Sequence, residues 1–335
     1  MRAYFVGTPV GGPVLGLVAS GRGYPVGVPS AVGQTPESTR AAPPRCAWCG
    51  GPAHPGRARL AVCPRCGAAT TFPVPDSEEL DRAYSTWYRP DSGRFGGGGD
   101  RVLAISRARL ARRLDRIAPP GPLLDVGSGD GSLLRAVRAR GREAVGLERT
   151  ATGEGVRAVE INDFHERRGQ WAAIVFWHSL EHLRDPAGAI DRAAELLAPG
   201  GIVLVAVPNL DSRQARRFGA GWFHLDLPRH LVHLPAAALT DGLRQRGLVV
   251  ERVSHWRGGQ ILFGWLYGGV RRLPGHADLY SAIRRTGAQD TEIAGARRVS
   301  VLLAAAALAP AAAVMAAGEI AAGAGGTVYV EARRP

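Results

Sequence analysis

From residue 122 onward, the chain alternates short apolar runs with segments of helical periodicity. The strand-like runs are PLLDV, EAVGLE, VRAVEI, AAIVFW and IVLVAV, at 122–126, 143–148, 156–161, 172–177 and 202–207. SLLRAVRARG at 132–141 and PAGAIDRAAELLAPGG at 186–201 have apolar residues at helical spacing and end in glycine. Strands that alternate with helices indicate parallel strands joined by crossover helices. The pattern therefore predicts an α/β fold with a doubly wound, mainly parallel sheet.

Further elements extend this pattern on both sides. PAAALTDGLRQRG and LVVERVSHW, at 235–247 and 248–256, add a helix and a strand, and GTVYVEARR at 326–334 is the predicted last strand. Upstream, 77–88 reads as a short helix opened by Asp76 or Ser77, and 102–117 as an amphipathic helix. We therefore expect a helical linker or cap over 73–120, a core over 121–256 and a final strand over 326–335.

The segment between the last two strands, 257–325, is an unusual apolar and basic insertion. It contains ILFGWLYGGV at 261–270, the uncharged run VSVLLAAAALAPAAAVMAAG at 299–318, and three arginine pairs, Arg271/Arg272, Arg284/Arg285 and Arg297/Arg298. The uncharged run is long enough to span a bilayer, but Pro310 interrupts it and the following strand must return to the sheet. An apolar hairpin packed on the domain is the favoured interpretation. A surface that docks on an anionic membrane and a membrane-spanning helix are the alternatives.

The first 44 residues are rich in glycine and proline and have no periodicity, which predicts a disordered leader. Glycine and proline also break the apolar stretch of this segment, whereas a signal peptide needs a continuous apolar core. We therefore expect a cytoplasmic protein, in contact with a membrane surface if the insertion docks there.

The net charge of +13 would suit a nucleic-acid partner. The chain contains no lysine, however, so all 42 basic residues are arginine, and it also has 45 Gly and 24 Pro. This composition indicates codons rich in G and C, so the charge is weak evidence for a polyanionic partner. Nucleic acid is accordingly the less favoured partner.

The four cysteines form one local pattern within 45–72. CAWC and CPRC are two Cys-x-x-Cys pairs separated by 13 residues. Each pair allows two thiolates to reach one ion, and four sulfur ligands satisfy tetrahedral zinc without leaving an open position. The spacing predicts a zinc ribbon with a structural ion held by Cys46, Cys49, Cys63 and Cys66.

LLDVGSGDGSLL, at 123–134, follows a predicted strand and opens a predicted helix. Glycines at 127, 129 and 131 permit a tight turn and a close approach of the backbone to a ligand. Glu148 ends the next strand, where a carboxylate can bind ribose hydroxyls. Asp125 and Asp130 add negative charge, which would repel a pyrophosphate but suits the sulfonium and ammonium groups of S-adenosylmethionine (SAM).

WHSLEH, at 177–182, has two incompatible interpretations. As His-x-x-Glu-His it is the inverted zinc-protease signature, with His178 and His182 one helical turn apart and Glu181 as general base. As the end of the apolar run AAIVFW it is the rim of a cofactor cleft in an α/β enzyme. The surrounding strand and helix pattern favours the second interpretation.

The chain resembles the class I SAM-dependent methyltransferases in five stretches taken together. These are LLDVGSGDGSLL, VGLE, VFWHSLEHLRDP, ELLAPGGIVLVAVPN and FHLDLPRHLVHL. The resemblance is greatest to the branch that includes the ubiquinone-biosynthesis O-methyltransferases. It covers about Pro122 to Trp256 and the final strand, and it implies a Rossmann-like seven-stranded sheet whose last strand is antiparallel.

The resemblance also implies roles for single residues. Asp125, Gly127 and Gly129 would hold the methionine part of SAM, with Asp130 and Gly131 in the same turn. Glu148 would bind the ribose, Asp163 would reach the adenine amine, and the cleft would be closed by Trp177 and His178.

Ubiquinone-type relatives carry a Glu-x-x-Glu-His form of the WHSLEH loop that is associated with a divalent ion. Here the matching residues are His178, Glu181 and His182, and the imidazole favours Zn²⁺ or Mn²⁺ over Mg²⁺. These residues either act in catalysis or bind a second divalent metal, or they only hold the loop. If the acceptor is a hydroxyl, His178 is the candidate base.

DLPRHLVHL, at 226–234, follows the fifth strand of the core and would face the acceptor. Asp226, Arg229 and His230 are candidates for orienting the acceptor, and capping of the next helix is the alternative role.

We therefore expect SAM-dependent O-methylation of a small or lipid-linked acceptor. The first alternative is an RNA methyltransferase, because zinc ribbons can hold RNA beside such a core. WHSL stands, however, where nucleobase amine methyltransferases often have Asn/Asp-Pro-Pro-Tyr. The second alternative is a non-catalytic, SAM-binding regulatory subunit.

Overall fold

A computed structural model describes residues 44–85, 97–150, 153–256, 259–275, 278–283 and 295–335. The predicted leader lies outside the described residues except for its last residue, and the Arg284/Arg285 pair lies outside them as well.

A seven-stranded sheet forms the core, in the order β10-β11-β8-β7-β4-β5-β6. Its strands are β4 (Leu123–Val126), β5 (Ala144–Glu148), β6 (Val156–Ala158), β7 (Trp171–Trp177), β8 (Leu197–Pro208), β10 (Val249–Ser254) and β11 (Thr327–Arg333). β4 to β8 run parallel, and β11 is antiparallel to both β8 and β10. The predicted sheet and its antiparallel last strand are confirmed.

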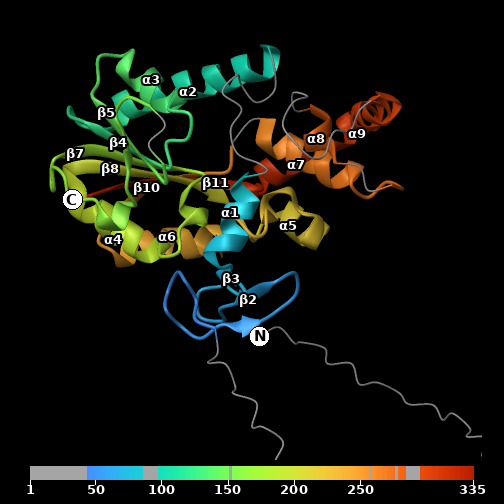
Figure 1. The fold of residues 1–335 in the computed structure, drawn as a ribbon, viewed down its shortest axis with the longest axis horizontal. Coiled ribbons are helices and arrows are strands. Elements are labelled where there is room, and N and C mark those ends of the chain that lie inside the picture. Colours follow the sequence, from blue (N-terminus) through green and yellow to red (C-terminus); the bar gives the residue numbers. More distant parts are fainter. Residues whose placement is uncertain (1–43, 86–96, 151–152, 257–258, 276–277, 284–294) are drawn as a thin grey trace, which may run out of the picture. The chain divides into compact units, whose positions relative to one another are not determined.

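Helices cover both faces of this sheet, as the doubly wound pattern predicts (Figure 1). α2 (Gly97–Ile117) and α3 (Ser132–Arg138) lie on one face, and α4 (Pro186–Leu196) and α6 (Ala236–Gln245) lie on the other. Successive side chains of a strand point to opposite faces. In β7, Ala173 and Val175 pack with the α2–α3 layer, whereas Ile174 and Phe176 pack with the α4–α6 layer. Burial on both faces explains why β7 is a continuous apolar run.

The cysteine-containing segment forms a second, smaller sheet, in the order β1-β2-β3-β9. β1 (His54–Pro55), β2 (Leu60–Val62) and β3 (Ala69–Thr71) belong to the predicted ribbon, whereas β9 (Val232–His233) lies 160 residues later in the chain. The short helix α1 (Ser77–Ser85) follows the ribbon, and Asp76 Oδ1 accepts a hydrogen bond from the amide of Glu79 at 2.7 Å. Asp76 is therefore the residue that opens this helix.

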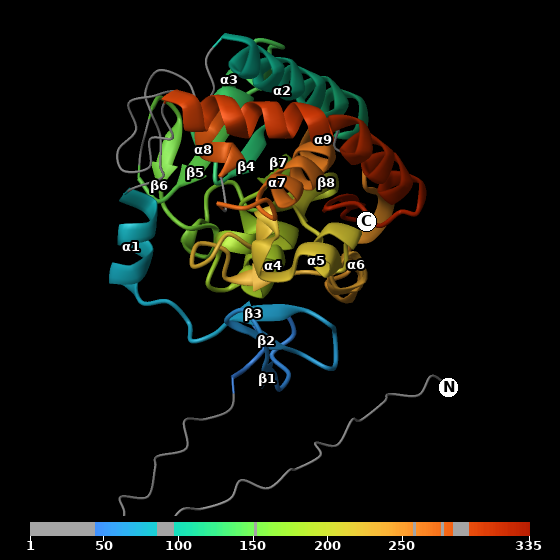
Figure 2. The ribbon, with the colours of Figure 1, turned by 90° about the vertical axis from the view of Figure 1, so that its right-hand side faces the viewer.

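The insertion before the last strand is helical, as predicted, and consists of α7 (Gly259–Val270), α8 (Leu279–Ile283) and α9 (Gly295–Ala321). α9 packs along α7 and α8 (Figure 2). By length and composition α9 could cross a membrane, and 22% of its apolar window is buried. Near its end, however, the fully buried Glu319 accepts hydrogen bonds from Gln214 and Trp265, at 2.8 Å each. These contacts fasten the end of α9 to α7 and to α5 (Arg213–Phe218).

Candidate active site

The glycine-rich turn between β4 and α3 is the first part of the site. Gly127, Gly129 and Gly131 have φ angles of 76°, 61° and 68°, in the left-handed region that favours glycine. At Gly127 an added Cβ atom would lie 2.5 Å from the Cβ of Ser179, so no side chain fits there. A turn of this kind presents backbone amides at the start of a helix, where a ligand can approach closely.

Glu148 reaches this turn from the end of β5. The amide of Gly129 donates a hydrogen bond to Glu148 Oε2 at 2.8 Å. The parallel pairing of β4 with β5, in which Val126 lies opposite Leu147, brings the two strand ends together. The Glu148 carboxylate therefore lies beside the glycine turn, at the edge of the sheet where the sequence predicts a ligand for ribose hydroxyls.

Two further carboxylates concentrate negative charge at the turn. Asp130 Oδ1 accepts a hydrogen bond from the amide of Ser132 at 3.0 Å. Burial raises the pKa of Asp125 to about 7, although the nearby Arg107 opposes this rise. A cation bound near Asp125 would favour its ionised form.

The WHSLEH segment leaves the sheet at the end of β7. His178 has a φ of 55°, and a short 3₁₀ turn, η2 (Leu180–His182), follows it. His178 and His182 are therefore not successive positions on one α-helix, as the inverted zinc-protease interpretation requires. That interpretation is wrong.

Glu181 is the buried centre of this segment, with 2% of its surface exposed. Neither of its carboxylate oxygens has a hydrogen-bond partner in the part of the chain that the structure describes. The Nδ1 atom of His178 lies 3.4 Å from Glu181 Oε1, and burial raises the pKa of Glu181 to about 7. The imidazole of His178 and this carboxylate are close enough to exchange a proton.

His182 and His230 lie beside Glu181, and one ligand atom from each of the three lies within 4.8 Å of the others. The Nδ1 atom of His182 is 3.0 Å from the carbonyl of Arg229, and that of His230 is 2.9 Å from the carbonyl of His224. A carbonyl only accepts hydrogen bonds, so both Nδ1 atoms carry the proton. The Nε2 lone pairs of both rings are then available to a ligand.

The three residues predicted to orient the acceptor meet at the same place. The guanidinium of Arg229, which is buried, donates a hydrogen bond to the Asp226 carboxylate. Asp226 Oδ2 lies 3.7 Å from the Nε2 atom of His230, and His230 Nε2 lies 4.0 Å from Glu181 Oε1.

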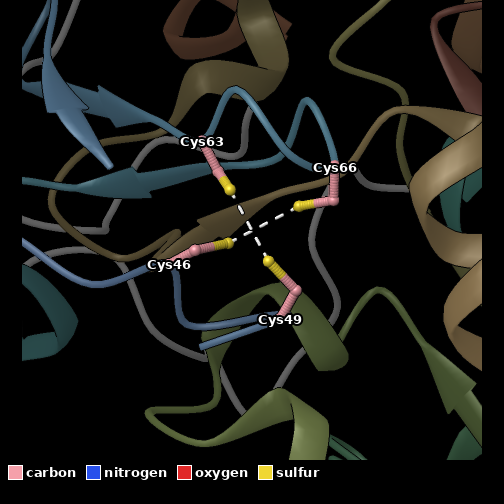
Figure 3. A group of neighbouring side chains, drawn as sticks. All are labelled: Cys46, Cys49, Cys63 and Cys66. Carbon is pink, nitrogen blue, oxygen red and sulfur yellow. Dashed lines mark hydrogen bonds between the residues drawn. The ribbon is translucent and has the colours of Figure 1, made fainter. Parts of the chain in front are cut away.

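The four cysteines form a separate cluster at the tips of two similar turns (Figure 3). The Sγ atoms of Cys46 and Cys66 are 3.7 Å apart, and those of Cys49 and Cys63 are 3.5 Å apart. Four sulfur atoms at about 2.3 Å from one tetrahedral ion would be about 3.8 Å from one another. All four cysteines are free thiols, so their arrangement fits a single metal ion.

One cavity of about 1990 Å³ joins the glycine turn to the histidine cluster. Its wall includes Gly127, Glu148, His178 and Glu181 on the side of the sheet. The insertion supplies another part of the wall, formed by Phe263, Tyr267, Tyr280 and Ile283.

Comparison with known proteins decides the family of the chain. A methyltransferase domain family model matches residues 101–253. The ubiquinone biosynthesis O-methyltransferase of Xylella fastidiosa is 30% identical over 171 residues, which cover 43% of this chain and 70% of that protein. The chain belongs to the class I SAM-dependent methyltransferases.

Other proteins are similar at lower identity. The ubiquinone biosynthesis O-methyltransferase of Xanthomonas axonopodis pv. citri is 28% identical over 176 residues, which cover 45% of this chain and 72% of that protein. A SAM-dependent methyltransferase structure from Archaeoglobus fulgidus covers 68% of this chain and 93% of its own, with 13% identity and a TM-score of 0.43.

In this methyltransferase, Trp177 and His178 both line the cavity. Arg107 of α2 lies over the Trp177 ring, 5.2 Å from its centroid. Asp163 is different, because its side chain is exposed and does not line the cavity, whereas Glu160 and Ile161 do. Asp163 ends a 3₁₀ turn, η1 (Ile161–Asp163), in which successive side chains are rotated by about 120°. With Ile161 turned inward, Asp163 faces away from the adenine side of the cavity.

Two polar residues of the methyltransferase site were not predicted from the sequence. The hydroxyl of Tyr84, from α1, lies 3.1 Å from the Nδ1 atom of His182. His224 is buried, its ring is parallel to that of His178 with centroids 6.4 Å apart, and burial lowers its pKa to about 3. Tyr84 belongs to no motif, and His224 lies within FHLDLPRHLVHL but received no role there, although the density of histidine between 178 and 233 is a signal that points to it.

The aromatic wall of the cavity is a third feature outside the sequence reasoning. The ring of Phe223 packs edge to face with those of Phe263 and Tyr267, with centroids 4.9 Å apart in both cases, and lies 5.8 Å from that of Tyr280. The spacing of four residues between Phe263 and Tyr267 in ILFGWLYGGV is the signal that places both on one face of a helix.

Proposed function

We propose that this methyltransferase transfers the methyl group of SAM to an oxygen of a small or lipid-linked acceptor. The observation that carries the proposal is the pairing of the half-buried His178 with the buried Glu181, both of which line the cavity next to the glycine turn. A base at this position suits an acceptor that must lose a proton, such as a hydroxyl.

The residues at the sheet edge fit SAM. Gly127 has no room for a Cβ atom, and Gly129 and Gly131 keep the turn open to a ligand. Glu148 would hold the ribose, Asp130 in the cavity wall would face the cationic part of the molecule, and the buried Asp125 at the end of β4 would add negative charge behind the wall. When bound there, SAM supplies an electrophilic methyl group on a sulfonium sulfur, which keeps the electron pair of the broken bond and leaves as S-adenosylhomocysteine (SAH).

The chain then has to align the acceptor and receive its proton. Asp226, Arg229 and His230 would orient the acceptor against the glycine turn, which is the main source of acceleration in such a displacement. As the acceptor oxygen bonds the methyl carbon, its proton passes to His178, and the Glu181 carboxylate stabilises the resulting imidazolium.

Glu181, His182 and His230 would hold a second divalent ion. Two imidazole nitrogens and one carboxylate favour Zn²⁺ or Mn²⁺ over Mg²⁺. The backbone carbonyls that accept the Nδ1 protons of both histidines resemble the outer partners that fix metal-binding imidazoles. A bound ion would supply Lewis acidity to an acceptor with two neighbouring oxygens. The four cysteines would hold a structural zinc ion, because the set is closed and leaves no open position.

The insertion supports an apolar acceptor. Its aromatic and aliphatic residues line the same cavity as the glycine turn. On the outside, the uncharged stretch of α9 exposes apolar side chains, including Leu303 (65% exposed) and Val314 (72% exposed). Large apolar surfaces of this kind mark interaction sites.

We place this surface on an anionic bilayer, at the cytoplasmic side. The insertion, 257–325, carries seven arginines against four acidic residues, and Arg297 and Arg298 stand at the start of α9. An apolar helix face flanked by arginine suits anionic lipid headgroups. The buried Glu319 at the other end of α9 supports docking rather than spanning.

Sedimentation with vesicles tests this surface. The protein is expected to sediment with phosphatidylglycerol vesicles at low salt and less at high salt, and not with phosphatidylcholine vesicles. Leu303→Asp and Val314→Asp should each abolish sedimentation, whereas Val253→Asp, at an exposed apolar position on β10, should leave it unchanged. A wild-type protein that stays in the supernatant at low salt would exclude the docking surface.

The acceptor class is tested with SAM labelled in its methyl group. After incubation with a cell extract, the label is expected in organic-soluble material, as a methyl ether. Label in RNA, together with strongly salt-dependent RNA binding, would instead support an RNA methyltransferase. SAM binding without transfer to any fraction would support a regulatory subunit.

A further inference from the structure

The four-cysteine ribbon is joined to the histidine cluster by a strand pairing. β3 of the ribbon pairs antiparallel with β9, with Ala69 opposite His233 and Thr70 opposite Val232. β9 directly follows the segment that contains Asp226, Arg229 and His230. The edge strand of the ribbon sheet, β9, therefore directly follows the segment that we propose orients the acceptor.

Thr71 makes the closest of these connections and is 1% exposed. Its amide donates a hydrogen bond to the carbonyl of Leu231 at 2.9 Å, and its Oγ1 hydroxyl donates one to the carbonyl of His230 at 2.6 Å. The Nε2 atom of His233 lies 3.1 Å from the same oxygen. The single hydroxyl proton points to the carbonyl, so His233 must donate its Nε2 proton to Oγ1.

The chain of hydrogen bonds continues to the centre of the site. The amide of Leu231 donates to the carbonyl of Glu181 at 2.7 Å. Thr71, Leu231 and Glu181 thus lie on one path of backbone hydrogen bonds from the ribbon to the main chain of Glu181. The same contacts fix the backbone from which the His230 ring approaches His182.

The ribbon is also held rigidly against the core. Trp48, which lies between Cys46 and Cys49 in the sequence, is buried and donates its Nε1 proton to the carbonyl of Ala238 at 2.9 Å. An added Cβ at Gly242 of α6 would lie 2.3 Å from the Trp48 ring, which shows how closely the two parts approach. Cys46, Trp48 and Cys63 belong to the same buried cluster as β7 and β8.

We propose that the ribbon is part of the methyl-transfer site and that Thr71 is a positioning residue, which sets the backbone of His230 and Glu181. The proposal rests on the assignment of these two residues to the site. Thr71 lies outside the cavity wall, so it acts through the segment it holds and touches neither SAM nor the acceptor.

Neighbouring Thr70 provides a matched control. It is buried in the same strand, but its Oγ1 accepts a hydrogen bond from the amide of Ala47 at 3.0 Å, inside the ribbon. Thr70→Val therefore removes a ribbon hydroxyl without touching the His230 segment. Thr71→Val removes the hydroxyl that bonds His230, and Thr71→Ser retains it.

The test is a long-range ¹H–¹⁵N spectrum of the histidine rings, recorded at neutral pH for the full chain with bound metal and for each variant. In the wild type, His233 is expected as the Nε2–H tautomer. Thr71→Val should give mixed tautomers at His233 and move the signals of His230 and His182, Thr71→Ser should restore the wild-type spectrum, and Thr70→Val should leave these signals in place. Identical His230 and His182 spectra in Thr71→Val and Thr70→Val would overturn the proposal.

Binding of SAH, measured by calorimetry on the same proteins, separates this proposal from the proposed function. SAH affinity should be equal in the wild type and in all three variants, because the glycine turn does not contact Thr71. A wild type that fails to bind SAH would refute the proposed function, while the histidine spectra would still decide the role of Thr71. With an acceptor, Thr71→Val should lower kcat about tenfold at unchanged KM for SAM.

Discussion

The imidazole rings of His182 and His230 lie edge to face, with their centroids 4.6 Å apart. Each ring donates its Nδ1 proton to a backbone carbonyl, which leaves both Nε2 lone pairs available, and that of His230 lies 4.0 Å from Glu181 Oε1. The two histidines come from segments almost 50 residues apart, on either side of β8 in the sequence.

We predict that this arrangement holds a metal ion distinct from that of the cysteines. Elemental analysis, after SAH saturation and with Zn²⁺, Mn²⁺ and Mg²⁺ offered separately, should find two ions per chain with Zn²⁺ or Mn²⁺. Glu181→Ala and His230→Ala should each lose one ion, and Cys63→Ser the other. His165→Ala, at an exposed histidine, is the control and should lose none. A single ion that disappears only with the cysteine substitution would show that the histidine cluster holds no tight metal.

A second prediction concerns the pH dependence of SAM binding. Burial raises the pKa of Asp125 to about 7, and its ionised form is the one that attracts a cation. SAM affinity should therefore fall as the pH drops below about 7, approaching tenfold per pH unit, and level off above it. Isothermal titration calorimetry across this range measures the dependence.

Asp125→Asn should remove most of this pH dependence and weaken binding at high pH. Asp163→Asn serves as the control, because Asp163 is exposed to solvent and lies outside the glycine turn, and it should keep the wild-type profile. A wild-type affinity that does not change between acidic and mildly basic pH would refute the role of Asp125.

A third prediction concerns folding stability in acid. Burial of Glu331 raises its pKa, but hydrogen bonds from Arg113 and Tyr329 outweigh burial and bring the pKa below its ordinary value of 4.5. A lowered pKa in the folded state means that the pair stabilises the fold fully above about pH 4.5. This stabilisation is lost as the pH falls through the folded-state pKa.

Glu331→Gln should thus lower the free energy of unfolding by about 2 kcal/mol at neutral pH and flatten its acid dependence. Urea unfolding at several pH values measures both effects. Glu251→Gln, which removes a more exposed partner of Arg333, should change stability by less than about 1 kcal/mol. Equal effects of the two substitutions on the free energy of unfolding would show that the Arg113–Glu331 pair stabilises the fold no more than an exposed ion pair.

The core of this fold can be predicted from its sequence because buried strands appear there as runs of apolar residues. β7 and β8 are packed on both faces, so they appear as continuous apolar runs, and the glycines at 127, 129 and 131 appear where the turn demands positive φ. The Cys-x-x-Cys spacing likewise places four thiols together because each pair closes its own local turn.

The contacts that complete the site depend on residues far apart in the chain. Thr71 and His230 are separated by 159 positions, and Tyr84 and His182 by 98, so no local periodicity connects them. Asp163 shows the opposite case. It lies at the expected position in the sequence, but the 3₁₀ turn η1 directs its side chain away from the cavity. The apolar character of the aromatic wall can be predicted from ILFGWLYGGV. Its position in the cavity cannot, because it depends on how α7 packs.

The most direct measurement is the rate of label transfer from methyl-labelled SAM to the acceptor fraction, by the wild type and by His178→Ala at saturating SAM. The wild type should transfer label to an oxygen, and His178→Ala should be slower by about a hundredfold while it still binds SAM in calorimetry. Equal rates for the two proteins, or a wild type that binds SAM and transfers nothing, would contradict the assignment of His178 and Glu181 as the proton-accepting pair of an O-methyltransferase.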